Sequence, residues 1–107
     1  MLDAVVLGPH RYSIEFVDEI PGRKKRVIGE AHRTTNRILV RNDQSASNLK
    51  STLLHEIAHQ ACWLSPLRFV DGWTDELEEA AICALETYIL ELFTRPENQA
   101  LRDYLTA

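Results

Sequence analysis

Apolar and polar residues alternate through the first half of the chain. Residues 12–17 (Tyr-Ser-Ile-Glu-Phe-Val) alternate at a period of two, which is typical of a strand with one buried face. The dipeptide Pro21-Gly22 predicts a turn. Two short apolar segments follow, Val27-Ile28 and Arg37–Arg41, with the polar stretch 32–36 between them. We therefore expect a three-stranded, mostly antiparallel sheet.

The second half has the longer period of amphipathic helices. Polar residues 43–48 offer N-caps before an apolar-rich stretch, Leu49–Leu64, that ends at Ser65-Pro66. Thr74 or Asp75 then caps a second helix that runs to about Phe93. A proline at position 96 stops this helix, and residues 98–105 are expected to form a short terminal helix.

The second helix is predicted to bury one apolar side against the rest of the fold. Its members are Leu77, Ala81, Ala84, Leu85, Tyr88 and Leu92. Because the strands come first and the helices second, we expect an α+β fold. A chain of 107 residues has the size of one domain, so residues 1–107 are expected to form a single domain.

Composition narrows the class of protein. Hydrophobic residues make up 45% of the chain and charged residues 26%, an ordinary composition for a folded domain. No apolar run approaches the roughly 20 residues of a membrane span, and the start lacks the pattern of a secretion signal. We expect a cytoplasmic protein without a membrane partner. The two cysteines, Cys62 and Cys83, are expected to be reduced and buried.

Charge argues against broad nucleic-acid binding. The formal net charge is −4, whereas such binding favours a basic domain. The basic segment Arg23–Arg26 is interpreted as a solvated hairpin tip, with a DNA-contacting role as the alternative.

The chemistry lies in His55-Glu56-Ile57-Ala58-His59, inside the first predicted helix. Histidines at i and i+4 lie on the same helical face, so both imidazoles can reach one ion. Zinc binds imidazole nitrogen and keeps an open position in catalytic sites. A glutamate beside the first histidine can take a proton from activated water, which is the role we assign to Glu56.

A third ligand is expected on the second predicted helix. That helix opens with four acidic residues, which also complement the helix dipole. The helical periodicity places Glu78 nearer the apolar side than Glu79, and a carboxylate among apolar residues needs a partner such as a metal. From the residues alone, both Glu78 and Glu79 stay open as the ligand.

These residues resemble the gluzincin peptidases, in which HExxH is followed by a ligand glutamate on a later helix. They resemble more closely the small phage and bacterial zincin-like proteins related to the ImmA/IrrE and SprT-like groups. The resemblance covers roughly residues 12–93, and its specific parts are Leu53–His59 and Glu78–Leu85. Cys83 stands where the ImmA-like pattern has an aromatic residue. No histidine follows His59, which departs from the SprT-like pattern and favours the glutamate form.

The resemblance implies a minimal zincin-like domain with zinc bound by His55, His59 and Glu79. Glu79 is preferred to Glu78 because Glu79-Ala80 matches the family context of a ligand followed by a small residue. Glu56 is then the general base and acid of a zinc metallopeptidase. The alternative function is a catalytically silent zinc-binding or protein-interaction module of phage or mobile-element origin.

The resemblance also implies that a protein or peptide substrate adds as a strand beside Arg37–Arg41, whose basic ends would favour acidic segments. Two further residues could take part in metal binding or catalysis. Cys62 could supply a thiolate ligand, or serve as a small buried side chain. His32 could donate to an oxyanion, or serve as a surface histidine. A domain of this size has few residues available to line a deep pocket. A partner or a second subunit could therefore complete the cleft.

Overall fold

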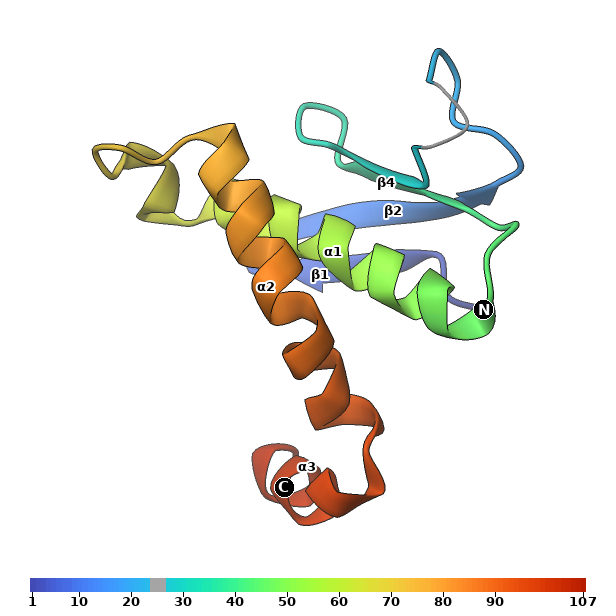
Figure 1. Cartoon of the computed structure of the whole chain (residues 1–107), viewed down its shortest axis with the longest axis vertical. Helices are drawn as coiled ribbons and strands as arrows, with labels where there is room; N and C mark the ends of the chain where they lie inside the picture. Colours follow the sequence, from blue (N-terminus) through green and yellow to red (C-terminus); the bar gives the residue numbers. More distant parts are fainter. Residues whose placement is uncertain (24–26) are drawn as a thin grey trace.

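The computed structural model describes residues 1–23 and 27–107, which form four strands and three α-helices in an α+β arrangement (Figure 1). The strands are β1 (Ala4–Leu7), β2 (His10–Val17), β3 (Gly29–His32) and β4 (Arg37–Arg41). The α-helices are α1 (Ala46–Leu64), α2 (Asp75–Thr94) and α3 (Gln99–Leu105), with the 3₁₀ turns η1 (Pro66–Phe69) and η2 (Pro96–Asn98) between them. None of the described helices combines the length and apolar character needed to cross a bilayer.

The sheet is mixed, with one parallel pair among its three strand pairs, and the described residues supply one strand more than the three predicted. Its order is β1-β2-β4-β3, with β2 and β4 parallel and the two outer pairs antiparallel. The physical reason is the long connection after β2, which carries the chain to the far edge before the turn at residues 33–36 brings β4 back inside. Asn36 takes a positive φ of 51° at the end of that turn.

One predicted strand is misplaced, and one observed strand was not predicted. Val27 and Ile28 precede β3, whose sequence Gly-Glu-Ala-His has no alternating apolar pattern. The short strand β1 was not expected; Gly8, at φ +56°, turns the chain tightly enough to pair β1 with β2. The predicted strands at residues 12–17 and 37–41 are confirmed.

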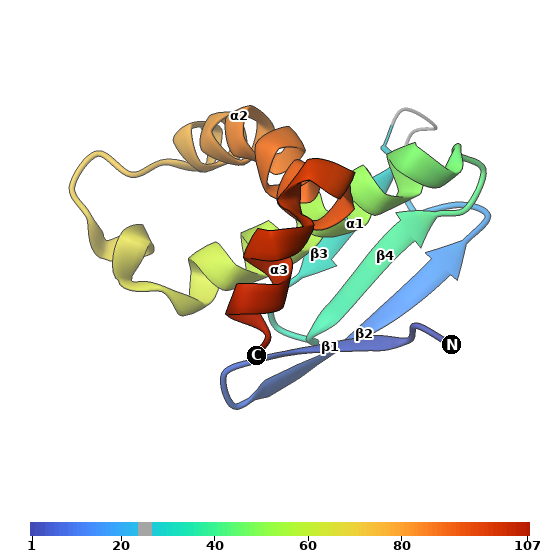
Figure 2. The ribbon, with the colours of Figure 1, turned by 90° about the horizontal axis from the view of Figure 1, so that it is seen from below.

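Helix α1 covers one face of the sheet (Figure 2). The core on this face consists of Tyr12, Ile14, Ile38 and Val40, and three apolar side chains of α1 pack against it: Leu49, Leu53 and Ile57. β4 is an interior strand, so its backbone pairs on both sides. The packing turns the opposite side of α1, with both histidines, away from the sheet core and toward α2.

The predicted helix boundaries are confirmed to within three residues. The Ser45 hydroxyl accepts a hydrogen bond from the backbone N–H of Asn48 at the start of α1, and Thr74 caps α2 in the same way. α1 ends at the residue before Ser65-Pro66, and α2 ends two residues before Pro96. Both ends therefore follow from local chemistry.

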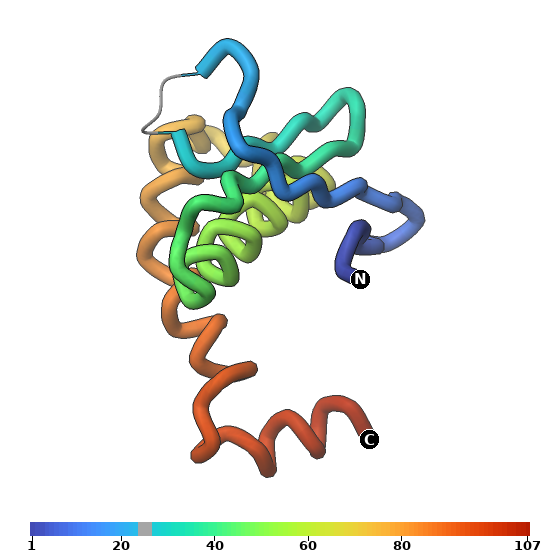
Figure 3. Tube along the Cα trace, turned by 90° about the vertical axis from the view of Figure 1, so that its right-hand side faces the viewer, coloured from blue at the N-terminus to red at the C-terminus, as the bar shows by residue number. Residues whose placement is uncertain are grey.

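The predicted buried side of α2 is exposed, which corrects the expectation from periodicity. Leu77, Leu85, Tyr88 and Leu92 all lie exposed, whereas Glu78 and Ile82 are the buried residues of α2. The cause is the crossing of the helices: α2 meets α1 along a narrow strip, and its second half extends away from the sheet with α3 at its end (Figures 1 and 3).

The basic segment 23–26 lies largely outside the described residues. Its first member, Arg23, places its Nε 2.5 Å from a carboxylate oxygen of Glu30.

Candidate metal centre

The two histidines of α1 stand one turn apart and face α2. Their ring centroids are 4.9 Å apart, and each side chain is 14% exposed. Their position follows from the packing of Leu53 and Ile57 on the sheet, because residues on the opposite side of a helix must then face outward. The sheet thus directs both imidazoles to the space between α1 and α2.

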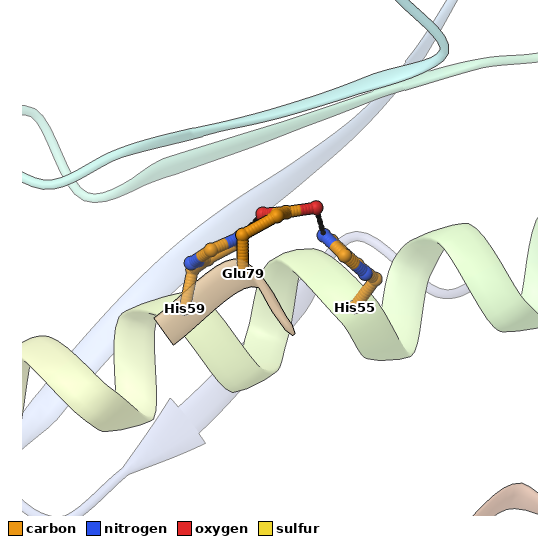
Figure 4. Close-up of side chains that lie close together, drawn as sticks. All are labelled: His55, His59 and Glu79. Atoms are coloured by element: carbon orange, nitrogen blue, oxygen red, sulfur yellow. Dashed lines mark hydrogen bonds and ion pairs between the residues drawn. The ribbon is translucent and has the colours of Figure 1, made fainter. Parts of the chain in front are cut away.

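Glu79 of α2 lies between the two histidines (Figure 4). One carboxylate oxygen is 2.8 Å from Nε2 of His55, and the other is 2.7 Å from Nε2 of His59. One ligand atom from each of these three residues lies within 4.8 Å of the others, and this group could hold a metal ion. The structure therefore brings together three residues that the sequence singled out.

Two further carboxylates of α2 contact the other nitrogens of the histidines. Oε2 of Glu86 lies 2.5 Å from Nδ1 of His55, and Oε2 of Glu78 lies 2.7 Å from Nδ1 of His59. Glu78 is therefore placed behind His59, on the side away from Glu79. In metal sites, such carboxylates hold the ring and select the tautomer of a ligating histidine.

This arrangement fits a cation. A neutral imidazole has one N–H donor, and donation from Nδ1 to Glu86 or Glu78 leaves Nε2 with a lone pair. The Nε2 lone pairs of His55 and His59 then face the carboxylate oxygens of Glu79, so that hydrogen-bond acceptors face one another without a donor between them. A metal ion bound by the two nitrogens and the carboxylate would remove this repulsion, and so would protonation of the rings. The donor set of two imidazoles and one carboxylate is one that zinc accepts.

Electrostatics around His59 and Glu79 favour the charged forms of both groups. Burial lowers the pKa of His59, but hydrogen bonds with Glu78 and Glu79 and the charge of Glu56 outweigh burial and raise it. Burial raises the pKa of Glu79, but the charges of His55 and His59 and the hydrogen bond with His59 lower it further than burial raises it. The site therefore concentrates negative charge around the histidines.

Glu56 is buried beside this group. Glu56 is 8% exposed. Burial raises the pKa of its carboxyl to about 7, although the charges of His55 and His59 act to lower it. A carboxyl with a pKa near 7 can both accept and return a proton at neutral pH.

Strand β3 passes close over Glu56 at Gly29. A Cβ at this position would lie 2.7 Å from Cγ2 of Thr52 and 2.9 Å from Oε2 of Glu56, so glycine is needed for the close approach. Gly29 was not expected from the sequence, because one glycine at the start of a polar strand gives little signal.

A cleft with two parts borders the candidate metal centre, one part on each side of it. One part, of about 430 Å³, lies beside His55 and Glu86 and includes Ile28 and Cys83. The other part, of about 360 Å³, lies beside His59 and includes Glu30, Trp63 and Asp75. Both parts share Gly29, His55, Glu56 and Glu79. The two parts of the cleft therefore meet at the candidate centre.

Of the other residues considered from the sequence, Cys62 and His32 contact neither histidine nor Glu79 in the described interactions, whereas Cys83 lies beside Glu79. Cys62 lines an apolar groove on another side of α1, and burial raises the pKa of its thiol. His32 hydrogen-bonds to Glu30 through Nε2. Cys83 is exposed, not buried as expected, and its Sγ lies 3.6 Å from Oε1 of Glu79.

Strand β4 does not have the edge position that strand addition requires. β2 and β3 flank it on both sides. Its basic ends are also paired: Arg37 donates to Glu15 over 2.8 Å, and Arg41 to Asp43. The expected substrate strand is therefore wrong on this point, and among the described strands β3 is the edge strand next to the site.

Glu86, like Gly29, was not singled out from the sequence. It stands seven residues after Glu79, which is two helical turns and therefore the same face of α2. That spacing could have identified it. Comparisons of the chain with family models, with curated proteins and with solved structures gave no match.

Proposed function

We propose that this chain is a zinc-dependent peptidase with its centre at His55, His59 and Glu79. The observation that supports the proposal best is the convergence of both Nε2 atoms on Glu79, with Glu86 and Glu78 behind the rings and Glu56 buried beside them. Structural zinc sites usually use four protein ligands, whereas three ligands leave a position open for catalysis.

A zinc ion at this centre would supply a Lewis acid that polarises the scissile carbonyl and activates water. The residues of the chain do the rest. Glu56 accepts a proton from the attacking water and returns it to the amine nitrogen as the carbon–nitrogen bond breaks. Its pKa of about 7 suits both transfers. Glu86 and Glu78 keep the histidines oriented throughout.

The peptide lies along β3 in this proposal. Among the described residues, β3 pairs with β4 on one side only, and Gly29, Glu30 and Ala31 line the cleft. Since the backbone N–H of Arg41 donates to Ile28 O, the alternation of an antiparallel ladder points the backbone of Gly29 and Ala31 to the free edge. A substrate backbone could pair there in extended form.

The test combines metal content with cleavage. Wild type, Glu79→Ala and Glu56→Gln are purified with zinc present, and bound metal and cleavage of a mixed peptide library are measured. We expect one zinc per chain and cleavage in wild type, zinc without cleavage in Glu56→Gln, and loss of both in Glu79→Ala. A wild type without bound zinc contradicts the centre.

The same experiment separates the alternative function. A catalytically silent metal-binding module would hold zinc in the wild type and cleave nothing in the library. Cleavage that persists in Glu56→Gln would indicate a contaminating enzyme and remove the support for Glu56 as the base.

A further inference from the structure

Two tryptophans support the candidate metal centre on the side of His59. Trp63 lies one turn after His59 on α1, and the two rings stack with their centroids 5.8 Å apart and their planes at 26°. Trp63 also lines the part of the cleft beside His59. Because residues four apart share a helical face, this stack forms within α1 itself.

The stack restrains a motion of the His59 ring that its hydrogen bond leaves open. Glu78 fixes the position of Nδ1, but a single bond at that atom still lets the ring tilt. The lone pair of Nε2 lies in the plane of the ring, so a tilt would turn the lone pair away from a bound metal. A flat indole against the face of His59 opposes the tilt.

Trp73 supports the same histidine through a carboxylate. Its Nε1–H donates to Oε1 of Glu78 over 3.3 Å, while Oε2 of Glu78 lies 2.7 Å from Nδ1 of His59. Glu78 is 3% exposed, so solvent does not readily replace either partner. The three side chains therefore connect the segment between α1 and α2 to the candidate metal centre.

A tight turn at the end of that segment places Trp73. Its backbone N–H donates to the carbonyl of Val70 over 3.0 Å, and Gly72 takes a φ of +85° within the turn, a conformation that favours glycine. The Trp73 side chain also lines the apolar groove between α1 and α2. Backbone and apolar contacts thus both hold the indole that donates to Glu78.

Electrostatics make the Trp63 stack stronger when His59 binds a metal. The face of an indole ring carries negative charge and attracts cations. Arg33, the residue after β3, shows this attraction, since its guanidinium carbon lies 5.8 Å from the centroid of Trp63. An imidazole that has given its lone pair to a metal is more positive than a free one. The indole therefore favours the metal-bound form of His59.

We propose that Trp63 and Trp73 are positioning residues of the metal centre, Trp63 by stacking on the ring of His59 and Trp73 by holding Glu78 behind it. The inference rests on the proposed centre at His55, His59 and Glu79. It adds that the segment between α1 and α2 takes part in metal binding, although it supplies no ligand.

The first test removes the stacked ring. Trp63→Leu should weaken zinc binding about 3–10-fold, the range that the loss of one aromatic pair predicts, whereas Trp63→Phe keeps a flat ring and should stay within about 2-fold of wild type. Competition with a chromogenic chelator measures both affinities, and circular dichroism checks that the variants fold. Recovery by phenylalanine but not by leucine is specific for stacking.

Phe69→Leu is the matched control for the loss of an aromatic ring. Phe69 also has a guanidinium over its ring, with the carbon of Arg68 4.7 Å from the centroid, but it stacks on no histidine in the described part of the chain. Its replacement should leave zinc affinity unchanged. An equal loss of affinity in Phe69→Leu and Trp63→Leu overturns the role of Trp63.

The second test removes only the N–H of Trp73. Trp73→Phe should weaken zinc binding about 3–10-fold, because Glu78 loses a donor and holds His59 less firmly. The chain has two tryptophans, so all tryptophan emission of this variant comes from Trp63. Saturating zinc should change that emission, since the metal binds the ring on which Trp63 stacks.

The outcomes separate this inference from the proposed function, because none of the measurements uses cleavage. A wild type without bound zinc contradicts the metal centre and this inference together. In a wild type that binds zinc, unchanged affinity in Trp63→Leu or in Trp73→Phe overturns the inference alone. Emission from Trp63 that zinc leaves unchanged, at full occupancy, also overturns it.

Discussion

Glu86 approaches Nδ1 of His55 to 2.5 Å from a position two helical turns beyond Glu79. One helix therefore carries both the carboxylate that faces the Nε2 atoms and the carboxylate that holds the first histidine from behind. The crossing of α2 over α1 makes this possible, because Glu79 reaches the space between the two rings while Glu86, seven residues further on, reaches Nδ1 of His55.

Replacing Glu86 by alanine should weaken metal binding without removing it. His55 loses the group that orients its ring, and loss of such partners typically costs about 10–100-fold in affinity. Competition with a chromogenic chelator measures the change. Glu91→Ala serves as the control, because Glu91 lies on the same helix with its carboxylate 4.0 Å from Arg95. Equal zinc affinity in wild type and Glu86→Ala would falsify this role.

Gly29→Ala should lower stability and cleavage together. The added Cβ meets Cγ2 of Thr52 at 2.7 Å and Oε2 of Glu56 at 2.9 Å, so β3 and Glu56 must shift apart. We expect a loss of about 1–3 kcal/mol in the free energy of unfolding. Chemical denaturation and peptide cleavage measure the two effects.

A second substitution separates the two contacts of Gly29. Thr52→Ser removes Cγ2 but keeps the hydroxyl that donates to Gln44. The double variant Gly29→Ala/Thr52→Ser should therefore recover part of the stability while cleavage stays low, because the contact with Glu56 remains. Full recovery of cleavage would show that the approach of β3 to Glu56 is unimportant.

The contribution of Glu56 to the stability of the metal-free protein should fall as pH rises from about 4.5 to about 7. The folded pKa of Glu56 is raised above its unfolded value, so the folded state binds more protons in this window and loses that advantage as the carboxyl ionises. The contribution is at most about 3 kcal/mol. Denaturation of chelator-treated wild type and Glu56→Gln across this range measures it; the variant should show a shallower slope. Identical slopes would contradict the raised pKa.

Ala31→Pro should abolish cleavage while zinc stays bound. Proline removes the outward N–H that a substrate backbone would use, and an edge strand tolerates it where that N–H is unpaired. Ala31→Ser keeps the N–H and is the matched control, with cleavage near that of wild type. If Ala31→Pro cleaves as well as Ala31→Ser, the peptide does not pair with β3.

Gln60→Leu should destabilise the fold by about 2–3 kcal/mol, because two partly buried backbone carbonyls lose their side-chain donor. Gln60 is 1% exposed, and its Nε2 donates to the backbone oxygens of His32 and Arg37 over 3.1 and 3.3 Å. Denaturant midpoints measure the loss. The exposed Gln99→Leu is the control, with an expected change within about 0.5 kcal/mol. Similar midpoints for both variants would mean that water replaces the Gln60 amide as the hydrogen-bond donor to these two carbonyls.

Local chemistry was enough to predict several elements. The caps Ser45 and Thr74 and the prolines at 66 and 96 determine where the helices begin and end, since each acts on neighbouring backbone groups. The pairing of His55 with His59 is also local, because four residues make about one helical turn. The fold class and the candidate motif could therefore be predicted from the sequence.

Tertiary structure decided the rest. The sequence pattern does not encode which strands become neighbours, so the parallel β2–β4 pair and the edge position of β3 depend on how the long connection after β2 runs. Glu78, Glu79 and Glu86 are alike as acidic residues of one helix. The angle at which α2 crosses α1 gives each a different nitrogen to face, and packing between elements sets that angle.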